Sequence, residues 1–385
     1  MAPFDGLRVS GKAPFKTNAK PLRLSPSKPV VHGQRPSPNG EARVAFALIE
    51  RLRRVRSEAL GLNRRNQDFF LRLNPPHLVA LVDHKVETKA VLARQGLPVP
   101  QTFGRYARQR ELANLAKEAE HRQEFVLKPA RGAGGVGVLV IAGRSGDRVV
   151  TIGGASLSPA DLLAHAADII AGAFSLSQTR DEALLEYRLT AERVLGAYSP
   201  GGIPDVRVVL FRGVPVMAML RLPTRTSDGR ANLHVGGIGV GLDLSTGRAV
   251  HAIWRDRAIT THPDTEKRLS ALCVPEWDAI VRIAAKTYDA IPLGYCGVDV
   301  VLDVRHGPVI LEMNARPGLS IQLANHRGLR ATLETLQQRS LDGLDVSARI
   351  ALGIALSEEP ETRDQRPGTR DQGPGTRDQG PGTRD

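Results

Sequence analysis

The chain has 385 residues, of which 41% are hydrophobic and 24% are charged, a balance typical of a globular protein with two or three compact lobes. Its two cysteines, Cys273 and Cys296, show no disulfide or zinc pattern, so we expect a cytoplasmic protein. No apolar run reaches the length of a membrane span or of the core of a signal peptide, so we expect no membrane span. The net charge of +13 indicates a polyanionic partner, either nucleotide phosphates or nucleic acid, unless it only reflects Arg-rich ends and basic helices.

The first hundred residues contain three kinds of sequence. Residues 1–40 are rich in Pro, Ser, Lys and Arg and lack apolar periodicity, which predicts a disordered basic arm. Residues 41–60 place apolar side chains at helical spacing with arginines on the other side, which predicts an amphipathic helix. A further helix is expected from His84 to Gly96, because prolines follow that glycine closely.

A glycine-rich passage lies between two strand-like runs in residues 125–142, FVLKPARGAGGVGVLVIA. Its glycines match the GxGxxG spacing of dinucleotide-binding proteins, but a strand-like run follows them where such a site requires a helix. Lys128 precedes the glycines, which also argues against a GxxxxGK[ST] phosphate loop. The passage therefore predicts either a hairpin whose bare amides approach phosphate oxygens beside Lys128, or a plain glycine-rich turn.

The middle of the chain predicts strands interrupted by charges. Residues 205–224 read as two long strands joined at Arg212-Gly213. Asp205, Arg207 and Arg221 interrupt these apolar strands, so their charges need partners. The other features expected here are helices at residues 159–171, 275–290 and 329–356, a short strand carrying Glu186, and a second glycine-rich passage at residues 230–241.

Residues 294–319 read as an antiparallel hairpin with polar side chains where apolar ones would be expected. The runs GVDVVLD and PVILEMN flank a turn at RHGP, and side-chain alternation brings Asp299 opposite Asn314 or Glu312. Two buried carboxylates repel each other, whereas a hard divalent cation takes oxygen ligands of this kind. Asp299, Glu312 and Asn314 therefore predict a magnesium site. The alternative is a solvated edge hairpin with ordinary surface acids.

The chain ends in TRDQGPG repeats without large apolar residues, so we expect residues 358–385 to be disordered. The order of the other features resembles the ATP-grasp superfamily and is similar to its RimK-type α-L-glutamate ligases. The resemblance runs from Gly61 to Arg330. It rests on the motifs GLNRRN, VETKA, IPDVRVVLFRGVPVMAMLRLPT, ANLHVGGIGVG, THPDT and EMNARPGLSIQLAN.

This resemblance implies an ATP-grasp fold of class α+β, with two α+β lobes that clasp ATP and a shortened N-terminal region. The implied division is residues 1–40 as the basic arm, 41–84 as a helical N-terminal region, 85–185 as the first lobe with the phosphate loop, 186–357 as the second lobe with the magnesium site, and 358–385 as the tail.

The resemblance also implies the roles of individual residues. Lys85 and Lys128 would contact the ATP phosphates, and Asp205 would approach the ribose. The remaining implied residues are Gly132, Gly134, Gly135 and Gly137 folding over the phosphates, Glu186 and Tyr187 beside the adenine, Arg230 and Asn232 near the triphosphate, Arg221 and Arg316 as clamps for an acyl phosphate, and Asp299, Glu312 and Asn314 as ligands of Mg²⁺ or Mn²⁺.

We therefore expect an ATP- and magnesium-dependent, ADP-forming carbon–nitrogen ligase of the acid–amino acid or peptide type. Its partners would be a carboxylate donor and an amine acceptor, such as an amino acid and a peptide or protein, and a homo-oligomer is compatible with the sequence. Val235 stands where the RimK-type pattern has a basic residue, so transfer of glutamate itself is left open.

Two alternatives remain. The first is an ATP-binding protein without ligase activity. The second is a basic nucleic-acid-binding protein. Two observations argue against it: only 4% of the residues are aromatic, which leaves little base stacking, and the sequence has no recognition motif. Its candidate basic residues are Arg51, Arg53, Arg54, Arg56, Arg64 and Arg65.

Overall fold

The computed structural model describes residues 58–131, 135–175 and 179–358, and the structural statements below concern these residues. Outside them lie the predicted basic arm, most of the predicted helix at 41–60, Gly132, Gly134 and nearly all of the repeat tail.

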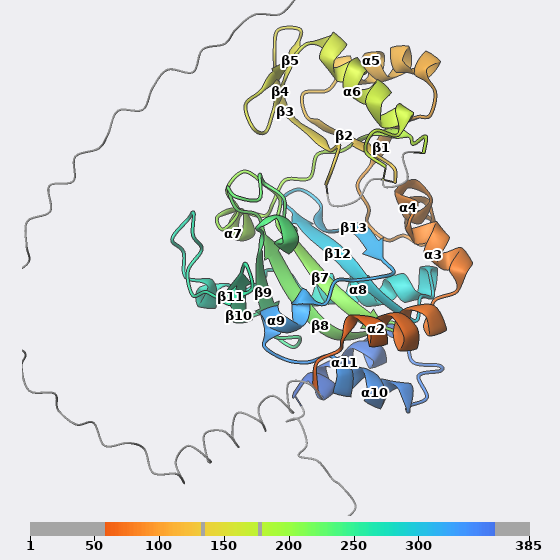
Figure 1. The fold of residues 1–385 in the computed structure, drawn as a ribbon, viewed down its shortest axis with the longest axis vertical. Helices are drawn as coiled ribbons and strands as arrows, with labels where there is room; N and C mark the ends of the chain where they lie inside the picture. The colour runs from red at the N-terminus through yellow and green to blue at the C-terminus, as the bar shows by residue number, and fades with distance from the viewer. Residues whose placement is uncertain (1–57, 132–134, 176–178, 359–385) are drawn as a thin grey trace, which may run out of the picture. The chain divides into compact units, whose positions relative to one another are not determined.

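The helices, several labelled in Figure 1, are α2 (Leu62–Arg64), η1 (Arg65–Leu71), α3 (Pro76–Val82), α4 (Lys85–Arg94), η2 (Gln109–Glu111), α5 (Leu112–Glu120), α6 (Pro159–Ala171), α7 (Arg193–Gly196), η3 (Leu233–Val235), η4 (Leu269–Ala271), α8 (Trp277–Ala290), α9 (Ser320–Asn325), α10 (Arg330–Gln337) and α11 (Val346–Glu358). The strands are β1 (Thr102–Tyr106), β2 (Phe125–Pro129), β3 (Leu139–Ser145), β4 (Arg148–Thr151), β5 (Ser156–Leu157), β6 (Ala183–Glu186), β7 (Asp205–Phe211), β8 (Val214–Leu222), β9 (Ile238–Leu242), β10 (Ala249–Trp254), β11 (Arg257–Ala258), β12 (Tyr295–Asp303) and β13 (Gly307–Asn314).

A six-stranded antiparallel sheet has the order β1-β6-β2-β3-β4-β5. Phe125 and Leu127 are two positions apart on β2 and therefore point to the same face, where they pack in a core shared with α5 and α6. The predicted helix at residues 159–171 is present as α6. It begins there because Ser158 caps it with a side-chain oxygen, and it ends there because Gly172 adopts a left-handed φ of 88°.

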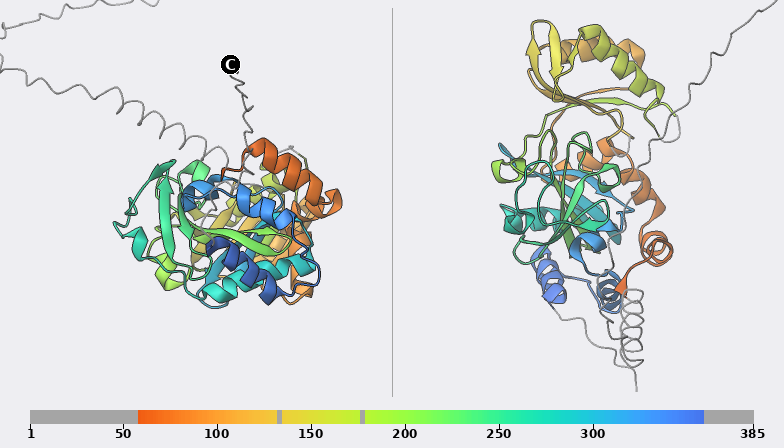
Figure 2. Two further views of the ribbon diagram at one scale, coloured as in Figure 1. Left: turned by 90° about the horizontal axis from the view of Figure 1, so that it is seen from below. Right: turned by 60° about the vertical axis from the view of Figure 1, so that its left-hand side comes forward.

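A seven-stranded antiparallel sheet has the order β11-β10-β9-β8-β7-β12-β13. Along β7, Val206 and Val208 face a core shared with α8, whereas Val209 and Phe211 face a second core shared with α10. Each such side chain contributes roughly 1.5–3 kcal/mol by its burial. The sheet is therefore covered by helices on both faces, as the turned views in Figure 2 show.

Both predicted hairpins of this sheet are present. β7 and β8 are joined at Arg212-Gly213, whose φ angles of 45° and 78° are those of a tight two-residue turn. β12 and β13 pair with Asp299 opposite Glu312, which is one of the two predicted registers. Because β12 lies between β7 and β13 and Asp299 is 0% exposed, the alternative of a solvated edge hairpin with surface acids is wrong for Asp299.

Residues that precede α4 bind the ends of this second hairpin. The side-chain amide of Asn74 donates to the carbonyls of Tyr295 and Ala315, at 2.7 and 3.3 Å, and its oxygen accepts from the N–H of Tyr295 at 2.9 Å. Arg65, buried in the π-helix η1, donates from Nη1 to the carbonyl of Pro317 at 2.8 Å. The segment before α4 is thus held against both β12 and the chain that follows β13.

Two further observations bear on the predicted organisation. All of β6 belongs to the six-stranded sheet, so the predicted boundary between residues 185 and 186 falls inside a strand. Across the described residues, no helix combines the length and the apolar character that crossing a membrane demands.

Candidate active site

Four charged side chains of the seven-stranded sheet form a buried cluster. Arg207 donates from Nε and Nη2 to the two carboxylate oxygens of Asp299, at 2.7 and 2.6 Å. Arg221 donates from Nε to Asp205 and from Nη2 to Asp299, both at 2.6 Å. The strand register causes these contacts, since Arg207 lies opposite Asp299 and Asp205 lies opposite Arg221. The three charges that were predicted to need partners therefore have them. Arg207 and Arg221 pair with Asp299, and Asp205 pairs with Arg221.

The two arginines set the protonation of the two aspartates. Burial would raise the pKa of Asp299, but the charges of Arg207 and Arg221 outweigh burial and hold this pKa well below its usual range. Burial raises the pKa of Asp205 to about 6, because the favourable charge of Arg221 is opposed by Asp299. Asp299 is therefore ionised at neutral pH, and Asp205 titrates closer to neutrality.

Glu312 and Asn314 on β13 adjoin this cluster. Asn314 donates from Nδ2 to Glu312 at 3.0 Å and to Asp299 at 3.4 Å. Two carboxylates and an amide oxygen are ligands that Mg²⁺ takes, so these three residues fit such an ion. Among the described residues, however, no three or more His, Cys, Asp and Glu side chains are grouped as metal ligands.

Two buried carboxylates repel each other unless positive charge lies beside them, and a divalent ion is one source of that charge. In the structure, Arg207 and Arg221 already supply positive charge at Asp299. The acid pair is therefore compensated by the protein itself, and the assignment of Asp299, Glu312 and Asn314 as metal ligands stays a prediction.

A second buried cluster joins the six-stranded sheet to α4. Glu186 accepts from Lys89 on one carboxylate oxygen and from Lys128 on the other, both at 2.6 Å. Burial would raise the pKa of Glu186, but the two ammonium groups lower it to about 2. Burial lowers the pKa of Lys89, and the charge of Lys128 adds to this effect. Sequence reasoning did not single out Lys89, although its spacing of four from Lys85 puts both side chains on one face of the helix.

Lys85, the first residue of α4, lies between the two clusters. Burial lowers the pKa of its ammonium group, Glu312 raises it, and Lys128 lowers it further, so both side chains are within electrostatic reach. A small cavity lined by Lys85, Lys89 and Glu312, together with apolar side chains, lies between α4 and β13. The structure thus brings predicted phosphate-binding lysines and a predicted metal ligand to one place.

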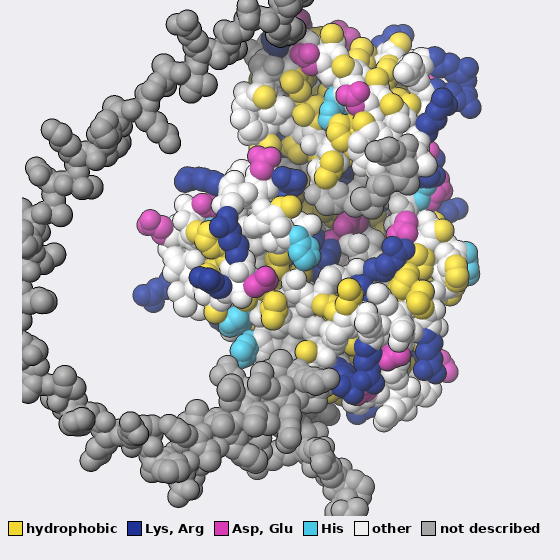
Figure 3. All heavy atoms as spheres, viewed as in Figure 1, with side chains coloured by type: hydrophobic (Ala, Val, Ile, Leu, Met, Phe, Trp, Pro, Cys, Tyr) yellow, Lys and Arg dark blue, Asp and Glu magenta, His cyan; other side chains and the backbone are white. Residues whose placement is uncertain are grey.

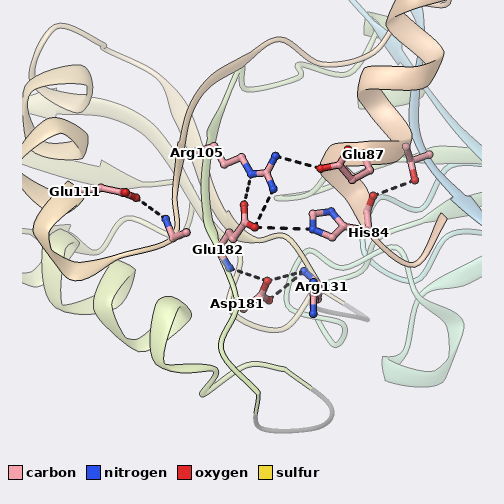
Figure 4. A network of polar contacts seen from close by, with 9 residues as sticks. His84, Glu87, Arg105, Glu111, Arg131, Asp181 and Glu182 are labelled. Carbon is pink, nitrogen blue, oxygen red and sulfur yellow. Dashed lines mark hydrogen bonds and ion pairs between the residues drawn. The ribbon is translucent and has the colours of Figure 1, made fainter. Parts of the chain in front are cut away.

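A polar network holds the start of the glycine-rich loop. The N–H of Arg131 donates to both oxygens of Asp181, at 3.1 and 3.0 Å, and the N–H of Glu182 donates to the same carboxylate at 2.8 Å. Figure 4 shows Arg105 reaching both Glu182 and Glu87, with which it forms ion pairs. These contacts fix β1, β6 and α4 around the point where the loop begins.

The described part of the loop is a connection between β2 and β3, as predicted, and no helix follows its glycines directly. Gly135 and Gly137 have left-handed φ angles of 78° and 74°. A Cβ on Gly137 would lie 2.5 Å from the ring of Phe174, so glycine is required there. A Cβ on Gly135 would lie 3.3 Å from Cδ of Arg230, which places the loop beside another predicted phosphate contact.

Three predicted site residues are held by contacts outside the two clusters. Arg316 is exposed and donates to Asp83 at 3.1 Å. The side chain of Asn232 accepts from the N–H of His234 at 3.0 Å. Tyr187 packs edge-on against a histidine of the β12–β13 turn, with ring centroids 4.9 Å apart. The structure therefore places Arg221, but not Arg316, in contact with Asp299.

Several solved structures share a distant likeness with the chain. The ATP-grasp ligase PsnB, complexed with a minimal precursor, has 16% identity and a TM-score of 0.36, covering 78% of this chain and 74% of that chain. The D-cycloserine synthetase DcsG has 18% identity and a TM-score of 0.35, covering 73% and 72%. The D-alanine-D-alanine ligase from Coxiella burnetii has 14% identity and a TM-score of 0.37, covering 74% and 59%. No curated protein matches the chain.

A family profile gives the stronger result. The family described as sugar-transfer associated ATP-grasp matches residues 64–338, which is more than half of the chain and includes both sheets and both buried clusters. The predicted ATP-grasp superfamily and α+β class are confirmed, while the RimK-type branch stays a prediction. The chain belongs to the sugar-transfer associated ATP-grasp family.

Proposed function

We propose that this chain is an ATP- and magnesium-dependent ligase that joins a carboxylate to an amine through an acyl phosphate. The observation that carries the proposal is the convergence of Lys85 and Lys128 with Glu312 beside the buried Asp299–Arg221 pair. Membership in an ATP-grasp family supports ATP as the co-substrate. Cationic groups for phosphates and oxygen ligands for a hard cation are what such a site needs.

The reaction would proceed in two steps. A carboxylate oxygen of the donor attacks the γ-phosphorus of ATP, and ADP leaves. The amine nitrogen then attacks the acyl carbon, the bond to the phosphate oxygen breaks, inorganic phosphate leaves, and the nitrogen loses a proton. Neither step needs a side-chain nucleophile, so the protein would contribute positioning and charge. A bound divalent ion would supply further charge neutralisation at the phosphate oxygens.

In this proposal the residues of the two clusters, and Lys85 between them, have different roles. Lys85 and Lys128 bind phosphate oxygens, and the glycine-rich loop lies over them with Arg230 at its side. Arg221 steadies the acyl phosphate, because two carboxylates fix its guanidinium. Asp205 is buried against Arg221, and this contact supports orientation of that arginine more directly than the predicted approach to a ribose.

We further propose a RimK-like acceptor chemistry, in which an amino acid or peptide takes part as substrate. The support is the order of the long motifs between Gly61 and Arg330, with Glu186 and Tyr187 at the predicted adenine position and Asn232 near the triphosphate. Transfer of glutamate is one case of this chemistry, and Val235 is a departure from the pattern that carries it.

The nucleic-acid alternative loses part of its basis. Arg64 forms ion pairs with Asp68 and Glu334, at 3.1 and 2.8 Å, and Arg65 is buried. The other four arginines of that hypothesis lie outside the described residues. On the face drawn in Figure 3, acidic and basic side chains are intermixed instead of forming a single basic surface.

The test is ADP release with Mg²⁺, measured over a panel of amino acids and of peptide and sugar carboxylates. We expect release that requires both a carboxylate and an amine, and loss of that release in Glu312→Gln. The matched control is Glu120→Gln, an exposed glutamate on α5. ATP binding without any substrate-dependent release would favour the ATP-binding protein without ligase activity.

A further inference from the structure

A cavity of about 430 Å³, within the size range of small-molecule sites, lies beside the loop that follows Asn232. Its walls come from three segments: the loop with His234 and Gly236, the β10–β11 turn with Arg255 and Asp256, and the start of α9 with Ser320. Its polar side chains include one cation and one anion next to each other.

The β10–β11 turn has an unusual sequence for its geometry. Ile253 pairs with Ala258 and Trp254 pairs with Arg257, which leaves Arg255 and Asp256 as a two-residue turn. Both have left-handed φ angles, 50° and 61°, where Asn, Asp and Gly are the ordinary residues. Strained conformations of this kind cluster at functional sites. The turn therefore carries an arginine in a conformation that disfavours it, and both of its charged side chains line the cavity.

Within the part of the chain that the structure describes, these two side chains have no charged partner. Among the described residues, neither Arg255 nor Asp256 takes part in any ion pair. The guanidinium of Arg255 instead lies 4.7 Å from the ring of Trp254, a cation–π contact that holds it in place. The indole N–H of Trp254 donates to the carbonyl of Gly236 at 2.9 Å, which ties two walls of the cavity together.

The cavity also adjoins the proposed site. Asn232, a proposed triphosphate residue, accepts from the N–H of His234 in the cavity wall. Ser320 follows Asn314, a proposed metal ligand, by six residues along the chain. The cavity wall therefore contacts Asn232, one residue of the proposed site.

From these observations we propose that the cavity binds the amine acceptor, and that Arg255 and Asp256 select an acceptor with a free carboxylate and a further N–H or O–H donor. The carboxylate would pair with the guanidinium of Arg255 and the donor with the carboxylate of Asp256. Amino acids and short peptides have this chemistry, whereas simple amines and amidated peptides lack the carboxylate. This inference rests on the proposed ligase function.

The experiment compares Arg255→Asn with Arg257→Gln, which removes a neighbouring exposed arginine that does not line the cavity. Asparagine suits a left-handed turn, so Arg255→Asn is expected to fold with an unchanged or higher unfolding midpoint. We expect the KM for the acceptor to rise at least tenfold in Arg255→Asn and to stay unchanged in Arg257→Gln. The KM for ATP stays unchanged in both.

Binding is measured separately by ligand-observed NMR without nucleotide, with mixtures of the twenty common amino acids and their dipeptides against the amidated forms of the same compounds. We expect binding of the free acids, weaker binding of the amides, and loss of this difference in Arg255→Asn. Equal binding of acids and amides, or no binding of either, would overturn the inference even if ADP release supports the ligase. Absence of ADP release with selective acid binding would instead reject the ligase, and with it the role of the bound acid as acceptor, and would support only carboxylate binding by the cavity.

Discussion

Arg207 and Asp299 lie opposite each other on β7 and β12 and share two hydrogen bonds, so a planar guanidinium meets a carboxylate in a fork on a fully buried strand. This pair anchors the charged cluster from which Arg221 and Asp205 extend. Removal of either partner would leave a buried charge with too few contacts.

Replacement of Arg207 by Met is therefore expected to lower the free energy of unfolding by about 3–5 kcal/mol. Urea denaturation at neutral pH measures this change. The control is Arg248→Met at an exposed position, which should stay within about 0.5 kcal/mol of the original protein. A stable Arg207→Met variant would mean that Arg221 alone compensates Asp299.

Replacement of Glu312 by Gln keeps the volume and shape of the side chain and removes one carboxylate beside Asp299. Without nucleotide, the free energy of unfolding should stay constant or rise, since Asp299 loses a like-charged neighbour. Magnesium-dependent ADP release should fall roughly a hundredfold, the scale for loss of one preorganised charge-stabilising group. Normal release at limiting magnesium would reject the metal-ligand assignment.

Replacement of Lys128 by Met should weaken ATP binding much more than adenosine binding, because the proposed contact is to phosphate. Calorimetry with both ligands measures the difference, and Lys117→Met on the exposed side of α5 is the matched control. The same variant also takes one of two cations away from Glu186. An equal loss for both ligands would point to a misfolded site and count against the phosphate contact.

The pH dependence of stability should report Glu186. Its pKa falls from 4.5 to about 2 on folding, so its contribution is complete above pH 4.5 and is lost as the pH drops toward 2. Glu186→Gln should be less stable than the original protein at pH 7, because Lys89 and Lys128 then repel each other. Between pH 5 and 3 the variant should lose less stability than the original protein. The measurement is urea denaturation of both proteins at several pH values in this range. If the unfolding free energies of the two proteins change with pH by the same amount, the assignment is contradicted.

Local features were accessible from the sequence. The hairpin of β7 and β8 follows from two nearly continuous apolar runs on either side of Arg212-Gly213, and α6 follows from its serine cap and terminal glycine. The partners of Asp299 were not accessible in the same way. Arg207 is 92 positions earlier in the chain, and only the pairing of β7 with β12 brings the two side chains together. Sequence alternation gives the face of a strand but not which strand lies beside it.

The same reason explains the omission of Lys89 and of the cavity. Lys89 on α4 contacts Glu186 on β6, which lies 97 positions later in the chain. Arg255 and Asp256 resemble an ordinary charged turn until their left-handed φ angles and their place in a cavity wall are known.

The contacts of Asn74 with Tyr295 and Ala315 affect how the protein can be divided for recombinant expression. A polypeptide shortened to begin at Lys85 would retain every lysine proposed to bind ATP. It would nevertheless leave polar backbone groups unpaired where β12 begins and β13 ends, at a cost of about 1–3 kcal/mol for each buried group. The segment before α4, through Arg65 and Asn74, therefore supports a hairpin more than two hundred residues away, and it belongs in any minimal folded fragment.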